Sequence, residues 1–179
     1  MRFVVVDLEF NQPSRKIIQI GAVVLDLQKG EIEPLFDEII DPEEEIDPFI
    51  EGLTGISDVD CDDADRIDQV MPRFWHEVCH SRTGKKMAAW GKDIEVIQEV
   101  SESVIENTPQ RIEIFDFKQY VRLFRFLDGK SSRSGCGLAN VVDSLDLEFE
   151  GQHHDAYDDA YMTAKVMLTY CEKLKNILR

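Results

Sequence analysis

The sequence predicts an α/β fold in which helices cover both faces of a mixed, five-stranded sheet. Two observations indicate it. Three runs rich in β-branched residues follow one another within the first 42 residues, and after about residue 63 segments with helical spacing alternate with short apolar runs. Consecutive strands joined by short turns form an antiparallel meander, and strands separated by helices add parallel neighbours. We therefore expect one sheet of mixed direction.

The first three strands are predicted from apolar runs with turn residues between them. Their sequences are RFVVVDLEF (2–10), KIIQIGAVVLDL (16–27) and PLFDEIIDP (34–42). The turn-like stretches NQPSR and QKGE separate them. Such clusters of Pro, Gly, Asn and Ser mark the ends of strands.

The remaining elements alternate between helical and strand patterns. Residues 62–81 place apolar side chains along one helical face, which Pro72 can kink. Two short strands are expected at 85–90 and 111–117, and helices at 93–104, 116–127, 138–147 and 155–178. The stretch GKSSRSG, 129–135, has the composition of a mobile loop. No repeat or linker divides the chain, so we expect one domain over residues 1–179.

The composition is typical of a soluble globular protein. The chain has 179 residues, of which 43% are hydrophobic and 31% charged. It has no apolar run near the 18 or so residues of a membrane span, and MRFVVVDLEF lacks a signal-peptide cleavage site, so we expect a cytoplasmic protein without a membrane partner. The four cysteines form no CxxC pair, which argues against a zinc knuckle or a disulfide framework.

The charge distribution restricts the partners that this protein can bind. The net charge is −16, which by itself argues against a polyanion. Most of the excess is local, because residues 37–68 hold 14 acids and one base, Arg66. An acidic flank weakens binding of long nucleic acids, yet it leaves other surfaces available. Any affinity for nucleic acid should therefore be modest and depend on metal.

Two acids interrupt the apolar run of the first strand. Strands are depleted in Asp, and a buried ionised carboxylate is costly unless a positive charge lies beside it. Asp7 and Glu9 are two residues apart, so both point to one face of the strand while Val6 and Leu8 point to the other. The sequence therefore predicts a pair of carboxylates directed at a cation.

Two further stretches place acids at helix starts. Gly91 permits a turn after the strand MAAW, and Asp93 begins the next helix, where a capping role would also explain it. In HHDAYDDAYMTA, His154 precedes the last helix and Asp159 lies in its first turns, where an acid also complements the helix dipole. Each element alone has a structural explanation, so the argument rests on their combination.

Together these stretches resemble the three motifs of the DEDD superfamily of 3′→5′ exonucleases, in its histidine subclass (DnaQ-like, with a ribonuclease H-like fold). The resemblance extends from Val5 to about Val166 and includes IIQIGAVVLD and LTGIS. The stretch LDLEFEGQHHDAYDDA is similar to the branch that holds exonucleases of the enhancer-of-RNA-interference type and a bacterial sporulation inhibitor. Relatives that hold long RNA often carry an added basic domain, and because the charged residues here are predominantly acidic we do not expect long structured RNA as a substrate.

The resemblance implies a role for each matching residue. Asp7, Glu9, Asp93 and Asp159 would hold two divalent cations, Mg²⁺ or Mn²⁺, with Asp7 bridging both. Oxygen ligands alone suit these metals better than zinc. His154 would accept the proton of the attacking water, since its unperturbed pKa is near neutral pH. The product would be a nucleoside 5′-monophosphate released from the 3′ end of single-stranded RNA or DNA.

The same resemblance points to residues that hold the substrate. Phe10 and Asn11 would face the terminal nucleotide, with Phe10 stacking on a base, although Phe10 also fits a core position. A further group, on the loop after the third strand, would meet the terminal base or ribose: Leu53, Thr54 and Gly55. The cations of the helix at 116–127 form one stripe, interpreted as a solvated face: Lys118, Arg122 and Arg125.

Three alternatives remain open at this point. A DNA-directed proofreading or repair exonuclease would carry the same motifs, because the preference for RNA or short oligonucleotides rests on the branch resemblance alone. A His-Asp metallophosphohydrolase built on His154 and Asp155 would need further histidine ligands, for which His76 and His80 at helical spacing are candidates. A non-catalytic module that binds a basic protein through residues 37–68 would have no need for the four acids. The oligomeric state is left open.

Overall fold

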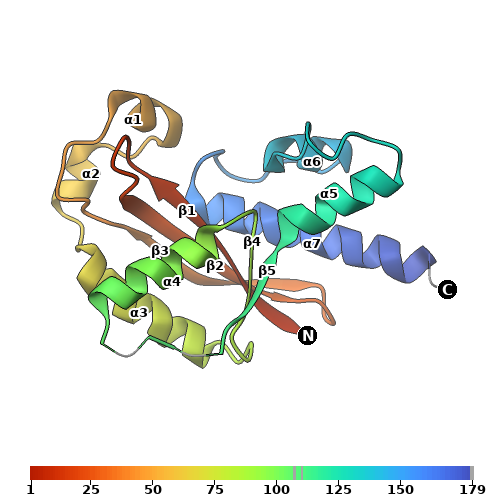
Figure 1. Cartoon of the computed structure of the whole chain (residues 1–179), viewed down its shortest axis with the longest axis horizontal. Coiled ribbons are helices and arrows are strands. Elements are labelled where there is room, and N and C mark those ends of the chain that lie inside the picture. The colour runs from red at the N-terminus through yellow and green to blue at the C-terminus, as the bar shows by residue number, and fades with distance from the viewer. Residues whose placement is uncertain (107, 110, 178–179) are drawn as a thin grey trace.

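The computed structural model describes residues 1–106, 108–109 and 111–177, and in this range it contains one five-stranded sheet (Figure 1). The strands are β1 (Arg2–Phe10), β2 (Ile17–Asp26), β3 (Glu31–Ile39), β4 (Lys86–Ala89) and β5 (Glu113–Asp116). Their order across the sheet is β3-β2-β1-β4-β5. β1 pairs antiparallel with β2, and β2 with β3, whereas β4 lies parallel to both β1 and β5. The predicted meander and mixed sheet are confirmed.

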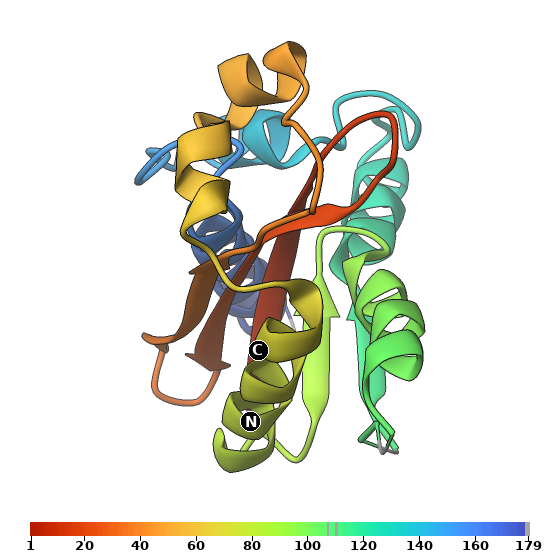
Figure 2. The ribbon, with the colours of Figure 1, turned by 90° about the vertical axis from the view of Figure 1, so that its left-hand side faces the viewer.

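Helices cover both faces of this sheet, as predicted. α3 (Ile67–His80) and α4 (Asp93–Val104) pack on one face, and α5 (Phe117–Leu127), α6 (Leu138–Ser144) and α7 (Ala156–Ile177) on the other. Figure 2 shows α3 in front of the strands and α7 behind them. The final residue of the helix predicted over 155–178 lies outside the described residues.

The alternation of β1 divides its side chains between two cores. Val4 and Val6 are fully buried among side chains of α3 and α4. Val5 is fully buried in the second cluster, which α5, α6 and α7 contribute. The period of two places Asp7 and Glu9 on the same side as Val5, under α7. The predicted orientation of these two acids is therefore confirmed.

The segment between β3 and α3 is more helical than predicted. β3 begins at Glu31 instead of residue 34, and the helix predicted over 62–81 begins only at Ile67, as α3, with a separate short helix, α2 (Asp58–Asp62), before it. Ser57 starts α2 with a capping box that Asp60 completes. The stretch expected to be a loop contains α1 (Pro48–Thr54), which is capped by the Asp47 side chain and has proline in its first turn. These short helices lack the long apolar periodicity on which the prediction relied.

No helix within the described residues is long and apolar enough to cross a membrane. The four cysteines are free, with Cys61 and Cys136 buried and Cys79 exposed.

Candidate active site

The predicted acids come together at the edge of the sheet where β1 and β4 end. These two strands are parallel neighbours, so Glu9 near the end of β1 and Asp93 just after β4 lie at the same edge. Asp93 is the first residue of α4, with Lys92 as its N-cap. Asp159 enters from the opposite side, in the first turns of α7.

Glu9, His154 and Asp159 form the centre of the cluster. One potential ligand atom of each lies within 4.8 Å of those of the other two. Asp93 is close enough for its charge to raise the pKa of both Asp7 and Glu9, and the charge of Glu9 raises the pKa of Asp7. His154 lies immediately before α7 in a left-handed backbone conformation, with φ of 62°. The structure thus brings together all five residues that the sequence predicted to act on the phosphodiester.

All four carboxyl groups resist ionisation, and burial is the largest cause at each. Burial and the charges of its three acidic neighbours raise the pKa of Asp7 well above its ordinary value. Burial and the charge of Asp159 raise the pKa of Glu9 from 4.5 to about 8. Burial raises the pKa of Asp93 and of Asp159 to about 6 each, although His154 lowers that of Asp159. These carboxylates can therefore ionise together only beside positive charge.

The donor set fits divalent cations. Among the described residues, the Oδ1 atom of Asp159 is buried and has no hydrogen-bond partner. Buried carboxylate oxygens normally find a partner, so this atom is suited to bind a cation. Four carboxylates provide the oxygen ligation that Mg²⁺ and Mn²⁺ prefer, and the site contains no thiolate that would favour zinc.

Close packing on β2 fixes the start of α7, and with it His154 and Asp159. Gly21 lies opposite Asp7 in the β1–β2 ladder. A Cβ atom at Gly21 would come within 2.1 Å of the backbone of Ala156 and Tyr157, so only glycine allows the helix to approach this strand. The glycine therefore sets the distance between the acid on α7 and those on β1.

Gln19 holds the start of α7 in place through hydrogen bonds. It is buried, its Nε2 atom donates to Asp155 Oδ2 at 3.0 Å and to Asp37 Oδ1 at 3.1 Å, and its Oε1 atom accepts from the Ala156 amide at 2.9 Å. The sequence analysis did not identify Gln19. A polar residue inside the apolar run IIQIGAVV is the same signal that identified the two acids of β1.

The remaining polar residues before α7 have structural partners. Asp155 Oδ1 accepts from the amides of Tyr157 and Asp158, both at 3.0 Å, which caps the helix. Asp158 Oδ2 accepts from the Gln152 amide at 2.7 Å. His153 packs its ring on Phe149, with centroids 3.7 Å apart. These contacts give each residue a structural partner, although the charge of His153 also lowers the pKa of Asp159 and that of Asp155 raises the pKa of Glu9.

The two residues predicted to follow the acids on β1 have different environments. Phe10 is half-buried against the first core, and the Arg15 guanidinium lies 5.8 Å from its ring centroid. Asn11 is buried, and its Nδ2 atom donates to Glu44 Oε1 at 2.8 Å and to the Glu45 carbonyl at 2.9 Å. Both amide hydrogens of Asn11 are therefore committed to the loop before α1, and we reassign this residue from substrate binding to holding that loop.

The end of α1 lies beside the approach to α7. Gln152 Nε2 donates to the Thr54 carbonyl at 2.7 Å. Leu53 is 37% exposed, whereas Thr54 is buried and its hydroxyl bonds to backbone atoms of Ile50 and Ile56. Gly55 ends the helix with φ of 79°. Of this predicted group, Leu53 has a partly exposed side chain, whereas the hydroxyl and the carbonyl of Thr54 are both occupied by hydrogen bonds within the protein.

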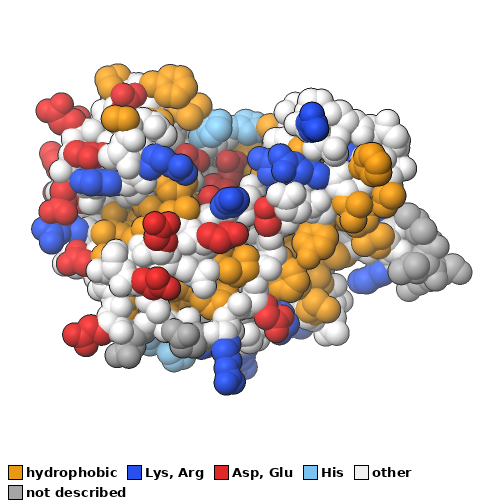
Figure 3. All heavy atoms as spheres, viewed as in Figure 1, with side chains coloured by type: hydrophobic (Ala, Val, Ile, Leu, Met, Phe, Trp, Pro, Cys, Tyr) orange, Lys and Arg blue, Asp and Glu red, His pale blue; other side chains and the backbone are white. Residues whose placement is uncertain are grey.

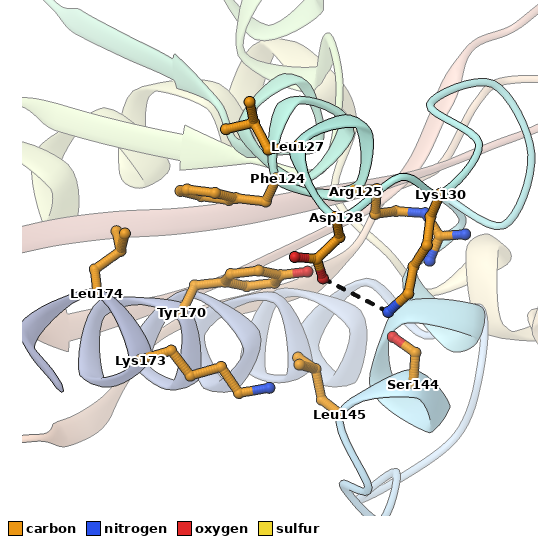
Figure 4. A pocket seen from close by; sticks show the side chains of 10 residues that line it. All are labelled: Phe124, Arg125, Leu127, Asp128, Lys130, Ser144, Leu145, Tyr170, Lys173 and Leu174. Carbon is orange, nitrogen blue, oxygen red and sulfur yellow. Dashed lines mark ion pairs between the residues drawn. The ribbon is translucent and has the colours of Figure 1, made fainter. Parts of the chain in front are cut away.

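The surface around the acids carries both signs of charge (Figure 3). Acidic and histidine side chains gather between α1 and α5, and Lys and Arg side chains lie next to them over α5 and the loop that follows it. An apolar pocket of about 310 Å³ lies apart from this cluster, between α5, α6 and α7 (Figure 4). None of the predicted site residues lines that pocket.

Comparison with known proteins agrees with this geometry. Residues 4–167 match the model of the Exonuclease family, RNase T. The chain belongs to this exonuclease family. The PolC-type DNA polymerase III of Clostridium perfringens (strain 13 / Type A) is 30% identical over 176 residues, which are 97% of this chain and 11% of the polymerase. ERI1 exoribonuclease 2 of Xenopus laevis is 25% identical over 177 residues, which are 86% of this chain and 25% of that protein.

A solved structure confirms the predicted ribonuclease H-like fold of this exonuclease. The nuclease domain of 3′hExo, described as a DEDDh family member and bound to rAMP, superposes with a TM-score of 0.79 at 19% identity. The superposition covers 96% of this chain and 92% of that domain. The chain thus spans a small part of its full-length curated relatives and most of an isolated nuclease domain.

The structure of the exonuclease does not support the phosphohydrolase alternative. His76 and His80 lie on α3, and the His80 Nδ1 atom is 2.7 Å from the His76 carbonyl oxygen. α3 packs on the face of the sheet opposite to α7, so the sheet separates these rings from His154 and Asp155.

Proposed function

We propose that residues 1–179 act as one metal-dependent 3′→5′ exonuclease domain that releases nucleoside 5′-monophosphates from single-stranded 3′ ends. The observation that carries this proposal is the convergence of four carboxylates and one histidine from β1, α4 and α7. Asp7, Glu9, Asp93 and Asp159 would hold two divalent cations, Mg²⁺ or Mn²⁺. Two findings support the choice of metal. The chain matches the Exonuclease family, and a solved structural neighbour, Pop2p of S. pombe, has Mg²⁺ and Mn²⁺ bound.

Bound divalent cations would offset the charge of the four carboxylates, polarise the phosphodiester and make water more acidic. The protein positions the other participants. His154 lies within 4.8 Å of the ligand atoms of Glu9 and Asp159 and is exposed, so its ring is placed to take a proton from a water on the substrate side. Leu53, at the end of α1, would contact the terminal base or ribose, and Phe10 offers a stacking surface.

We favour RNA or short oligonucleotides as substrates over duplex DNA. The name of the frog relative, exoribonuclease 2, and the rAMP bound to 3′hExo support this choice. The rival is a DNA-directed proofreading or repair exonuclease, which the PolC-type polymerase favours because it matches nearly the whole chain. Rates on single-stranded RNA and DNA of the same sequence separate the two.

The test uses 5′-labelled single strands incubated with Mn²⁺, Mg²⁺ or a chelator and resolved by length. We expect a ladder that shortens from the 3′ end with metal and no products with chelator. Asp7→Ala and Asp159→Asn should nearly abolish turnover while the protein stays folded, and the control Asp143→Asn, at an exposed position on α6, should retain it. Shortening from the 5′ end, or full activity of Asp159→Asn, would contradict the proposal.

A further inference from the structure

A hollow of about 460 Å³ lies on the outer side of α5. It is lined by Gln119, Arg122, Leu123, Phe126, Ser132 and Arg133. None of these residues is acidic, although the chain carries 36 acids and 20 bases. Phe126 is 66% exposed and Leu123 52% exposed. The hollow thus combines two cations with an open aromatic ring.

The cations of the hollow are free to bind a ligand. Among the residues that the structure describes, neither Arg122 nor Arg133 forms an ion pair, and the Nε atom of Arg122 is buried without a hydrogen-bond partner. An unpaired guanidinium is suited to bind a phosphate through two hydrogen bonds.

Contacts on the inner side of α5 and in the following loop hold the hollow in shape. Phe124 stacks on Tyr170 of α7, with centroids 5.2 Å apart and planes at 15° (Figure 4). Arg125 donates to the carbonyls of Ser131 and Ser134 at 3.2 and 3.3 Å. Arg125 is therefore a structural residue, and Arg133 takes its place in the cationic surface. The loop expected to be mobile is fastened to the helix.

The hollow lies on the helix that begins beside the catalytic edge, since the charge of Lys118 in its first turn acts on Asp93. β4 and β5 are parallel neighbours, so Asp93, after β4, and Lys118, in the first turn of α5, lie side by side. From Lys118 to Phe126, α5 rises about 12 Å at 1.5 Å per residue. A stacked strand rises about 3.4 Å per nucleotide, so this length corresponds to about three or four nucleotides.

We propose that this surface, defined by Lys118, Arg122, Phe126 and Arg133, binds the single-stranded nucleic acid on the 5′ side of the terminal nucleotide. The arginines would hold phosphates, and Phe126 would stack on a base. This inference rests on the proposed function, because it assigns the path of the substrate of the same site. It also revises the interpretation of the helix stripe as a solvated face.

The test compares substrates of different length. Arg122→Gln/Arg133→Gln and Phe126→Ala are assayed with Mn²⁺ on a dinucleotide and on a single strand of about eight nucleotides. The control Lys29→Gln/Lys175→Gln removes the same charge at exposed positions away from the catalytic edge. We expect the ratio of kcat/KM for the long strand over the dinucleotide to fall about ten-fold in the arginine variant and to stay constant in the control.

Binding of the labelled long strand gives a second readout by fluorescence anisotropy, measured with Mn²⁺ in the His154→Ala background, where turnover should be slow and the metal retained. Each phosphate contact of a single strand contributes about 0.7 to the slope of log K against log salt, so the arginine variant should lose about 1.4. Phe126→Ala should weaken binding and leave this slope unchanged, because stacking releases no counterions.

The two proposals can fail separately. If the wild-type protein cleaves neither substrate, the proposed function fails, and the anisotropy series still decides whether α5 binds the strand. If the arginine variant binds the long strand with the wild-type affinity and salt slope, the substrate path is wrong. In that case a nucleic acid does not bind this surface, and an acidic protein would be the alternative partner.

Discussion

Replacing Glu9 with glutamine should stabilise the metal-free protein at alkaline pH. Burial and neighbouring acids raise the pKa of this carboxyl group to about 8 in the folded protein, from an ordinary value of 4.5. The folded state therefore binds the proton more tightly than the unfolded chain does. The stability that protonation provides is fully present below about pH 4.5 and is lost as the pH rises through about 8. The amide side chain of the Glu9→Gln variant would remain neutral throughout this range.

The size of the effect follows from the difference between the two pKa values. At about 1.4 kcal/mol per pKa unit, ionising Glu9 costs up to about 4 kcal/mol at pH 8 and less than about 1 kcal/mol at pH 5. Because the side chain is only half-buried, solvent screens part of this cost, and we expect a gain of about 2 kcal/mol at pH 8. For a chain of this length that gain raises Tm by about 4–8 °C.

Thermal melts in chelator at several values between pH 5 and pH 8 measure the gain. Glu99→Gln is the matched control, since Glu99 is exposed on α4, away from the acids. Saturating Mn²⁺ should reverse the order of the two melting temperatures at pH 8. The wild-type protein is stabilised by bound Mn²⁺, whereas Glu9→Gln has lost a carboxylate that would hold the metal. A variant that melts lower than the wild type by the same amount at pH 5 and pH 8 in chelator would refute the argument that these carboxylates repel.

Three other substitutions test the geometry of the site. His154→Ala should lower turnover about 10²- to 10⁴-fold while changing Mn²⁺ affinity little. Equal losses in turnover and in Mn²⁺ affinity would show that His154 is a metal ligand. His153→Ala serves as the control. Gly21→Ala should cost about 1–3 kcal/mol of stability and weaken Mn²⁺ binding, because the added Cβ displaces α7. The control Gly52→Ala should do neither, since no atom lies within 4 Å of its Cβ. Normal Mn²⁺ affinity in Gly21→Ala would contradict this prediction. Gln19→Leu should lose about 1–3 kcal/mol and lower kcat more than it raises KM, and a change in KM alone would contradict its role in positioning the start of α7.

Strand period and helix starts were sufficient to place three of the four acids, whereas the chemistry assigned to them came from the family resemblance. The spacing of Asp7 and Glu9 placed both acids on one face, because a strand alternates its side chains with a period of two. The turn at Gly91 placed Asp93 at a helix start. Both inferences need only local geometry. That Asp159 meets the acids of β1 came from the family resemblance, since no local pattern encodes a contact between segments so far apart in the sequence.

The features that the sequence analysis missed depend on tertiary partners. Asn11 and Thr54 have residue types that suit substrate binding, and only the structure shows that neighbouring backbone and side chains occupy their polar atoms. Arg125 has the same charge as Arg122 and nearly the same helical position. Arg125 donates hydrogen bonds to the loop that follows α5. The Nε atom of Arg122 has no hydrogen-bond partner among the described residues.

The two sides of the catalytic edge differ in charge, and this difference orients the substrate. Residues 37–68, which include α1 and α2, carry 14 acids and lie on one side, where Leu53 would meet the terminal nucleotide. A phosphodiester chain that continued over this segment would meet like charge at each step. The opposite side presents Lys118, Arg122 and Arg133 within a few nucleotides of the same edge. A strand whose 3′ end enters between α1 and α7 would therefore leave over α5, because that direction is the one in which its phosphates meet opposite charge.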